Sequence, residues 1–516
     1  MGRVLAIRLT LVNTGPRTSR GYGLAGRSGR AARPDRTGTR GIACFDGSVS
    51  VRGDGRLPGR QRIRGKVTTT GPEAFTPTDP VGTLSGIRVV EIAQNAAVPY
   101  CGRLLAGMGA DVVKVEPPDG DAMRRLADLG PNEARAYAAI NPGKRSIVLD
   151  LGTEDAGEVL HGLFRWADVV LVGVKGSDLD RFGIGWDHVR EVNPRAVHLT
   201  HTAFGPDGPD ADVGGYDVLV QALSGAGFIM NRSENGVPIP TRPAVNDFGT
   251  GIASALAVVA ALWDRDRTGE GQRVDTSLLA TALGLGTALL HRFEADGDDL
   301  RSFRSDLEEI RSSGGGFDEQ RALYESDMLQ GQTAFRLYFR TYATVDGLVS
   351  VAGLSPGLYR KFHEVTGIPR PASRIGASSP EFLAVVDEAE RCFAAETTGH
   401  WLEAFRTVGY PCGRYNLPDE ALEDPQVVAN DFVVGLDHPE FGHYVTTGMP
   451  LRMEASQVAV RGPSPGLGAH TVEVLYEIGF SRRRIEELSS AGAVTPGGSP
   501  SEASGPGEQR SIQKGP

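Results

Sequence analysis

The runs IRVVEIA (87–93) and DVVKVE (111–116) set the fold class of this chain. Each is short, apolar and rich in β-branched residues, as buried strands are. Segments of helical character separate these runs from later ones of the same kind, at 146–151, 168–172 and 195–200. Strands that alternate with helices predict an α/β protein whose parallel sheet is covered on both faces. Ligands of such sheets bind at the carboxyl ends of the strands.

The common nucleotide-binding signatures are missing from this sheet. No G-x-G-x-x-G follows the first strand, and the chain has no P-loop. These glycine-rich loops are the usual cradles for a dinucleotide or for a nucleoside triphosphate. The sequence therefore predicts a different mode of ligand binding.

Outside the sheet, composition divides the chain into further segments. Residues 295–338 are charged and Gly-rich, which predicts an exposed linker or lid. A small α+β domain is expected over 339–417, and residues 418–490 contain loops, short strands and helices. Residues 491–516 are rich in Gly, Ser and Pro, so we expect them to be disordered.

The overall composition is that of a soluble globular protein, with 40% hydrophobic and 23% charged residues. A length of 516 residues predicts two domains plus tails. The sequence has no uninterrupted apolar run of about 18 residues, so no membrane span is expected.

Charge is distributed unevenly along the chain. Residues 1–66 hold 15 Lys and Arg against three Asp, so this segment carries +12 and the remainder −22. An acidic body argues against nucleic acid or an anionic membrane as a partner. Residues 1–83 are Arg-, Gly-, Ser- and Thr-rich with little periodicity, which predicts a disordered basic extension. A targeting peptide and a start codon assigned too early are alternatives.

Cysteines and histidines show no metal-binding pattern. The cysteines form no C-x-x-C pair and the ten histidines have no metal-ligand spacing, so we expect no metal site. Widely spaced cysteines also give no disulfide framework, which predicts a cytoplasmic location. The four cysteines are Cys44, Cys101, Cys392 and Cys412.

One polar loop precedes the most apolar helical run of the chain. The loop is RPAVNDFGTG (242–251), and the run that follows is IASALAVVAALW (252–263). Asp247 is thus expected at or just before a helix N-terminus, where free N–H groups and the helix dipole favour a carboxylate. From its position alone, Asp247 is most simply a helix cap.

The order of motifs along the chain resembles the class III CoA-transferases, the family of formyl-CoA transferase, carnitine CoA-transferase and α-methylacyl-CoA racemase. The resemblance runs from about Leu84 to Ser490. The motifs that carry it are LSGIRVVEIA (84–93), GADVVKVEPPDGD (109–121), NPGKRSIVLDL (141–151), RFGIG (181–185), NPR (193–195), FGPDGP (204–209), GGYD (214–217), NDFGTG (246–251), TGEGQRVDTSLL (268–279) and LGAHTVEVLYEIGFS (467–481).

The resemblance implies an interlocked homodimer with coenzyme A as the group carrier. Each subunit would have a Rossmann-like large domain built from both ends of the chain, over 84–294 and 418–490, with the small domain between. An acyl-CoA and a carboxylic acid would be the substrates. The family's catalytic aspartate lies in the loop that matches VNDFG (245–249), which makes Asp247 the predicted nucleophile.

An aspartate suits this chemistry because a carboxylate can attack a thioester and form a mixed anhydride. The freed CoA thiolate can then attack the anhydride and leave an aspartyl-CoA thioester. Gly249 and Gly251 are predicted to allow close approach and to offer free N–H groups to a tetrahedral oxyanion. Simple loop flexibility is the alternative explanation for these glycines.

The resemblance also implies contacts to coenzyme A. Arg181 matches an arginine that holds the nucleotide end in formyl-CoA transferase, and Leu149 matches an adenine-side contact. The loop after the first strand, where further contacts are expected, holds Gln94, Asn95, Ala96 and Ala97.

Several positions depart from the formyl-CoA transferase pattern. The loop at 94–97 differs, Pro117 replaces an expected Arg, and Gly173 replaces an expected Asn. These departures predict that formyl-CoA and oxalate are not the substrate pair.

Two other functions are alternatives to CoA transfer. Racemisation needs two bases that flank an α-carbon. Tyr216, a predicted CoA contact, stands where the racemase branch has His, and Ser355 stands where it has Glu, so the elements of one base are missing. A non-catalytic CoA-binding protein is the third possibility, and the intact Asp247 segment argues against it.

Overall fold

The computed structural model describes residues 82–126, 128–130, 133–329, 333–371 and 379–497. The predicted N-terminal extension therefore lies outside the described residues, apart from its last two positions. The predicted disordered tail lies outside them from residue 498 onward.

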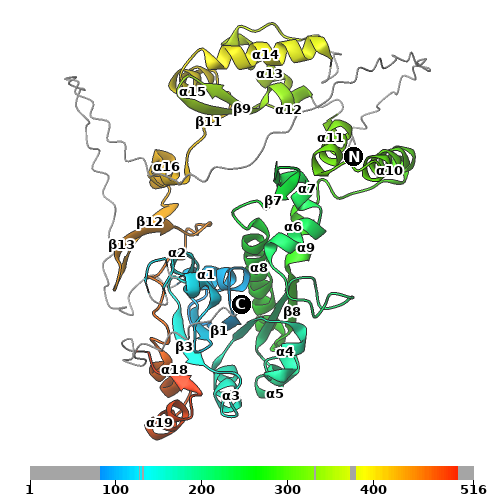
Figure 1. The fold of residues 1–516 in the computed structure, drawn as a ribbon. Coiled ribbons are helices and arrows are strands. Elements are labelled where there is room, and N and C mark those ends of the chain that lie inside the picture. The colour runs from blue at the N-terminus through cyan, green and yellow to red at the C-terminus, as the bar shows by residue number, and fades with distance from the viewer. Residues whose placement is uncertain (1–81, 127, 131–132, 330–332, 372–378, 498–516) are drawn as a thin grey trace, which may run out of the picture. The chain divides into compact units, whose positions relative to one another are not determined.

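A seven-stranded sheet is the largest sheet in the part of the chain that the structure describes (Figure 1). The spatial order is β14-β3-β2-β1-β4-β5-β8, and every neighbouring pair is parallel except β14 with β3. This confirms the predicted α/β class and the parallel sheet. Its strands are β1 (Arg88–Ala93), β2 (Asp111–Glu116), β3 (Arg145–Leu149), β4 (Val169–Gly173), β5 (Val197–Thr202), β8 (Arg273–Ser277) and β14 (Val494–Thr495).

The direction in which the six parallel strands are added reverses once. From β1 the chain adds β2 and β3 on one side, and it then returns to add β4, β5 and β8 on the other. The helices that follow β1 and β4 therefore leave on opposite faces, so the loops at these two strand ends separate. This is the topological switch point at which open α/β sheets bind ligands.

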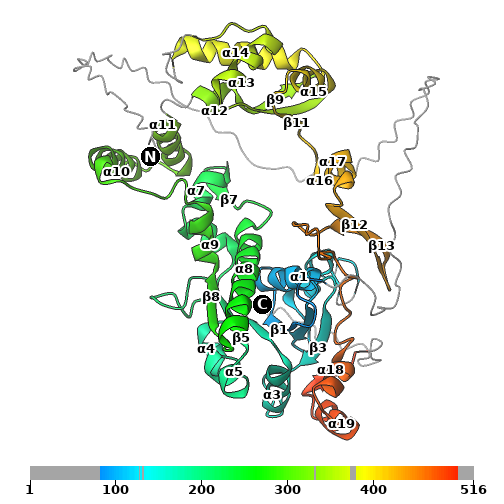
Figure 2. The ribbon, with the colours of Figure 1, turned by 180° about the vertical axis from the view of Figure 1, so that it is seen from behind.

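Both faces of the sheet are covered by helices, as the buried strands require. One apolar core lies between the sheet and a helix pair, α1 (Ala97–Gly107) and α8 (Val245–Thr268), which run side by side in both views (Figures 1 and 2). The core on the other face includes residues from α3 (Ala156–Trp166), α5 (Trp186–Val192), α18 (Thr471–Glu477) and α19 (Arg482–Ser490).

The C-terminal segment enters the sheet, which differs from the predicted tail. Val494 pairs with Leu149 and Thr495 with Val148. Ala493 and Val494 are buried in the same core as β3, so apolar burial orders residues 491–497 despite their Gly-rich surroundings. The large sheet is thus built from both ends of the described chain.

Helix α8 begins earlier and ends later than predicted. Val245 starts it, so Asp247 lies within the first turn and not in a loop. It continues to Thr268 and is ended by Gly269, whose φ of 82° suits the left-handed C-cap. Among the described residues α8 alone is long and apolar enough to cross a membrane. A core helix has the same properties, and α8 packs along α1 and the sheet.

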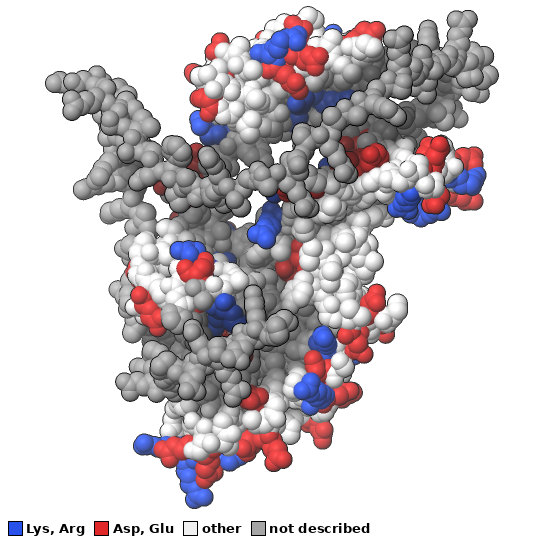
Figure 3. Space-filling view, in the orientation of Figure 1, with Lys and Arg blue, Asp and Glu red and all other residues white. Residues whose placement is uncertain are grey.

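The predicted linker at 295–338 is largely helical. The segment forms η2 (Glu294–Asp296), α10 (Gly297–Ser312), α11 (Phe317–Leu329) and α12 (Thr333–Leu337). The segment is helical because it is rich in Leu, Glu and Arg, which favour helix. Ion pairs between residues four apart, such as Arg321 and Glu325 at 2.7 Å, add to the stability of these helices. The lobe that holds α10 carries both signs of charge (Figure 3).

The predicted small domain has a core of its own. Strands β9 (Phe339–Thr344), β10 (Gly347–Ala352) and β11 (Cys412–Arg414) form an antiparallel sheet. Its core is aromatic and includes Tyr342 stacked on Phe393 at 4.0 Å between ring centroids. Its helices are α13 (Pro356–Thr366), α14 (Pro380–Ala394) and α15 (Thr398–Thr407).

The remaining elements lie within these units or between them. They are η1 (Ala122–Leu126), α2 (Arg135–Ile140), α4 (Gly176–Arg181), α6 (Asp217–Leu223), α7 (Ala226–Met230), β6 (Arg232–Glu234), β7 (Val237–Ile239), α9 (Leu278–Leu285), α16 (Pro418–Glu423), α17 (Pro425–Ala429), β12 (Val433–His438) and β13 (Gly442–Thr447).

Candidate active site

Two adjoining hollows open at the switch point, with volumes of about 470 and 560 Å³. Five residues line both hollows. Gln94 and Asn95 directly follow β1, Gly173 ends β4 and Val174 follows it, and Tyr216 precedes α6. Because the hollows share these walls, they form one groove across the carboxyl ends of the strands. A groove of this size suits an extended small molecule.

The predicted site residues divide between the two hollows. The first hollow contains Asp247 together with the whole of the loop 94–97. The second contains Leu149, at the end of β3, and Arg181, at the end of α4. Residues predicted from widely separated motifs are thus brought together, with the predicted nucleophile at one end of the groove and the predicted nucleotide contacts at the other.

Asp247 occupies an environment that opposes its charge. Burial, reinforced by the nearby carboxylate of Asp217, raises the pKa of Asp247 from 3.8 to about 6. The side chain is only partly buried and lines the first hollow. Above pH 6 Asp247 is therefore an ionised, poorly solvated carboxylate next to a space for a ligand.

Asp217 holds the first turn of α8 in place. Its Oδ1 accepts the N–H of Asn246 at 3.0 Å, and its Oδ2 accepts from the side-chain amide of Gln221. Asp217 is buried and is the first residue of α6. Asp217 thus joins the start of α6 to the residue beside Asp247.

The predicted oxyanion role of Gly249 and Gly251 needs correction. Both glycines lie inside α8, so their N–H groups belong to the helical hydrogen-bond ladder and are not free for a ligand. A Cβ on Gly251 would lie 2.8 Å from the carbonyl oxygen of Ala97 and 2.8 Å from Cδ1 of Tyr100. Gly251 therefore allows α8 to approach α1 closely, which is a packing role.

Two polar residues of the first hollow, Lys175 and His201, were not predicted from the sequence. Lys175 lies two residues after β4, and His201 lies near the end of β5. Burial lowers the pKa of His201 to about 4, so the imidazole is neutral at physiological pH. Their position at the carboxyl ends of predicted strands was the signal that could have identified them.

The structure shows the surroundings of three other residues that the sequence analysis singled out, Arg181, Gly173 and Ser355. Arg181 is largely exposed, pairs with Asp178 at 3.2 Å and lies over the ring of Phe182. A Cβ on Gly173 would lie 3.0 Å from Cβ of Ala93 and 3.1 Å from Cγ2 of Val98, so a larger residue there would require these neighbours to shift slightly. Ser355 caps α13 by accepting the N–H of Leu358 at 3.3 Å.

No group of three His, Cys, Asp or Glu side chains with metal-binding geometry occurs within the described ranges.

Comparison with known proteins settles the family. Residues 84–312 and 316–471 match the model of CoA-transferase family III. The chain belongs to this family. It is 33% identical over 420 residues to the formyl-CoA:oxalate CoA-transferase of Streptomyces avermitilis, covering 80% of this chain and 99% of that one. The protein of that name from Bradyrhizobium diazoefficiens is 30% identical over 427 residues, with 80% and 97% covered.

Solved structures share the fold of this CoA-transferase. A CAIB/BAIF family protein from Brucella suis has a TM-score of 0.59 and 26% identity, covering 77% of this chain and 100% of that one. A hypothetical protein from Mycobacterium tuberculosis has a TM-score of 0.61 and 25% identity, with 76% and 99% covered. The predicted family and enzyme class are confirmed, and the family implies CoA thioesters as substrates.

Proposed function

We propose that this family III enzyme transfers coenzyme A from an acyl-CoA to a carboxylic acid through covalent intermediates on Asp247. The observation that supports this most directly is the position of Asp247. Its carboxylate lines the end of the groove opposite Leu149 and Arg181. An acyl-CoA with its nucleotide near those two residues would extend its thioester toward Asp247.

In the first half of the reaction a carboxylate oxygen of Asp247 attacks the thioester carbon. The C–S bond breaks, the CoA thiolate leaves with the electron pair, and the acyl group remains as a mixed anhydride. The thiolate then attacks Cγ of Asp247. The bond between Cγ and the bridging oxygen of the anhydride breaks. The donor acid therefore departs as a carboxylate with that oxygen, and CoA is left as an aspartyl thioester.

The second half reverses these steps with a different acid. The acceptor carboxylate attacks Cγ of the aspartyl thioester, and the thiolate leaves. The new anhydride is attacked by the thiolate at the acceptor's acyl carbon. The acceptor leaves as its CoA thioester, and the Asp247 carboxylate is restored.

The surroundings of Asp247 suit both halves. Burial beside Asp217 makes the free carboxylate less stable, so its conversion to a neutral anhydride or thioester relieves an unfavourable charge. The first turn of α8 supplies a partial positive charge, worth about 0.3–1 kcal/mol, that keeps ionisation within reach near pH 6. Neutral His201 in the same hollow adds no competing charge.

We also propose a substrate pair other than formyl-CoA and oxalate. In the groove, Pro117 and Gly173 stand where the formyl-CoA transferase pattern has Arg and Asn. Proline brings no charge and glycine brings no side-chain amide, so neither residue supplies the polar group that this pattern has at its position. A panel of acyl-CoA donors and acids, with formyl-CoA and oxalate included, tests this proposal.

A homodimer is the proposed assembly, and an exposed apolar stripe on α8 supports it. Ile252, Leu256 and Trp263 recur on one face of this helix and are 50%, 71% and 69% exposed. Clusters of large exposed apolar side chains mark interaction surfaces. A second copy of the chain is the partner that the resemblance implies.

Covalent trapping tests the proposed chemistry. The enzyme is incubated with an acyl-CoA, treated with hydroxylamine, digested and examined by mass spectrometry. We expect a hydroxamate on Asp247, and none in Asp247→Asn. Normal turnover by Asp247→Asn would refute the mechanism, and solvent deuterium at the α-carbon of recovered acyl-CoA would favour racemisation instead.

A further inference from the structure

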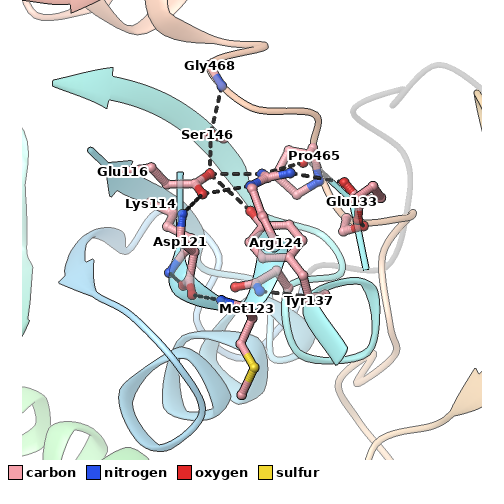
Figure 4. Close-up of polar contacts among 12 residues, drawn as sticks. Lys114, Glu116, Asp121, Met123, Arg124, Glu133, Tyr137, Ser146, Pro465 and Gly468 are labelled. Carbon is pink, nitrogen blue, oxygen red and sulfur yellow. Dashed lines mark hydrogen bonds and ion pairs between the residues drawn. The ribbon is translucent and has the colours of Figure 1, made fainter. Parts of the chain in front are cut away.

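A cluster of buried polar side chains consists of Glu91, Lys114, Glu116, Asp121, Arg124, Glu133, Tyr137 and Lys144, and Figure 4 shows the part of it around Glu116. Four of its members, Glu91, Lys114, Asp121 and Lys144, have fully buried side chains. Lys114 Nζ lies 2.9 Å from Glu91 Oε1 and 2.8 Å from Asp121 Oδ2, and Lys144 Nζ lies 2.8 Å from Glu91 Oε2. Two carboxylates and two ammonium groups therefore balance one another. A balanced charge is a condition for burying so many ions.

This cluster holds the turn after β1 at three successive residues. Lys114 Nζ donates to the carbonyl oxygen of Ala93 at 2.7 Å. The side-chain oxygen of Gln94 accepts the N–H of Ala122 at 3.1 Å. The N–H of Asn95 donates to Oδ1 of Asp121 at 3.1 Å. Main-chain and side-chain atoms of the turn are thus tied to β2 and to the start of η1.

The turn needs such restraint because of its backbone conformation. Asn95 has a φ of 68°, in the left-handed region that non-glycine residues rarely adopt. Asn95 and Gln94 line both hollows at the switch point. An unrestrained turn would relax toward ordinary φ values and change the wall that the two hollows share.

Further hydrogen bonds, with Glu116 and Met123, hold Asp121 in place. Its own N–H donates to Oε2 of Glu116 at 3.0 Å, and its Oδ1 also accepts the N–H of Met123 at 2.9 Å. Glu116 is held in turn by Arg124 Nε at 2.7 Å and by the hydroxyl of Tyr137 at 3.1 Å. Figure 4 shows these side chains converging on Glu116 from η1 and α2.

From these contacts we infer that Asp121 is a positioning residue for the CoA groove, because its carboxylate keeps Asn95 in the left-handed conformation that shapes the wall between the two hollows. Asp121 does not line either hollow, so it acts through Asn95 and not by contact with a ligand. The inference rests on the proposed function to the extent that the ligand of the groove is an acyl-CoA.

Asp121→Ala and Tyr137→Phe form a matched pair for the test. Both remove one polar group from the same buried cluster, but only Asp121 contacts Asn95. Burial lowers the pKa of Lys144 to about 8, so loss of the Asp121 charge can be offset by release of a proton from Lys144. Asp121→Leu, whose side chain is close in size to that of Asp and has no acceptor for the Asn95 N–H, serves if the alanine variant does not fold.

Two measurements on the full-length protein separate positioning from general stability. Hydrogen–deuterium exchange of the peptide that contains Gln94–Val98 is measured without ligand, and the Kd for coenzyme A is measured by calorimetry. For Asp121→Ala we expect faster exchange of this peptide and a Kd raised about tenfold or more, whereas Tyr137→Phe should change the Kd by less than about twofold. The Asn95→Gly variant, which tolerates the left-handed conformation, should recover part of the affinity in the Asp121→Ala background.

Unchanged exchange in the Asp121→Ala peptide would overturn the inference, whether or not CoA binds. Equal loss of affinity in Tyr137→Phe would also overturn it, because the cluster would then act only through stability. Failure of the unaltered protein to bind CoA would contradict the proposed function, while the exchange measurement would still decide the role of Asp121.

Discussion

Replacing Asp247 by Asn is expected to abolish transfer and yet to make the folded protein more stable at neutral pH. Burial and the adjacent carboxylate of Asp217 raise the pKa of Asp247 from 3.8 to about 6. At about 1.36 kcal/mol for each pKa unit, this difference corresponds to a ceiling of about 3 kcal/mol of destabilisation when Asp247 is ionised. Asp247 is only partly buried, so solvent screening lowers the expected gain to about 1–2 kcal/mol.

The gain should depend on pH in a defined direction. The folded state binds the Asp247 proton more tightly than the unfolded state does, so ionisation costs stability as the pH rises from 3.8 to about 6. The difference between Asp247→Asn and the unaltered protein should therefore be full above pH 6. It should shrink as the pH falls through 6 and vanish below 3.8.

Urea unfolding followed by tryptophan fluorescence at pH 8 and pH 5 measures this difference. Asp207→Asn, which changes an exposed loop carboxylate, is the control and should alter the unfolding free energy by less than about 0.5 kcal/mol. An Asp247→Asn variant that is no more stable than the parent at pH 8 would refute the reasoning. So would a stability gain that is as large at pH 5 as at pH 8.

Four further outcomes are expected. Formation of the covalent adduct should slow about tenfold between pH 7 and pH 5, because a group with a pKa of about 6 is about nine-tenths ionised at the first pH and about one-tenth at the second. Arg181→Ala should raise the KM for acyl-CoA about tenfold, whereas Arg190→Ala, on an exposed face of α5, should leave it unchanged in steady-state assays. Trp263→Glu should shift the protein from dimer to monomer in sedimentation velocity. Gly251→Ala should lower the unfolding free energy by about 1–3 kcal/mol, because the added Cβ would meet α1. Gly249→Ala should lower it by less, because a Cβ there would meet only flexible side chains at 3.1 Å.

Local sequence patterns were sufficient to predict five of the seven strands of the sheet, but not β8 or β14, and to predict the edge of the sheet at which the two hollows lie. The runs at 87–93 and 111–116 are apolar and β-branched because they are buried on both sides, and such runs are recognisable without tertiary information. The rule that ligands bind at strand ends then placed the site at the carboxyl end of β1, where both hollows lie. Resemblance to the family added Asp247, Leu149 and Arg181.

Features that depend on tertiary contacts were not predictable in the same way. The two-residue strand β14 is ordered by pairing with β3, and its Gly-rich surroundings gave the opposite signal. The helices at 297–312 and 317–329 were obscured by the glycines between them. Asp121 lies 26 residues after Asn95, and no local sequence pattern predicts the hydrogen bond between them.

The proposal that Asp247 carries the acyl group and then coenzyme A is tested most directly by mass spectrometry of the intact protein and its peptides after rapid quenching with an acyl-CoA. We predict two successive mass additions on the peptide that contains Asp247, first of the acyl group and then of coenzyme A, and neither on Asp247→Asn. Transfer activity with no mass added to that peptide, or with the additions on another residue, would contradict the proposal.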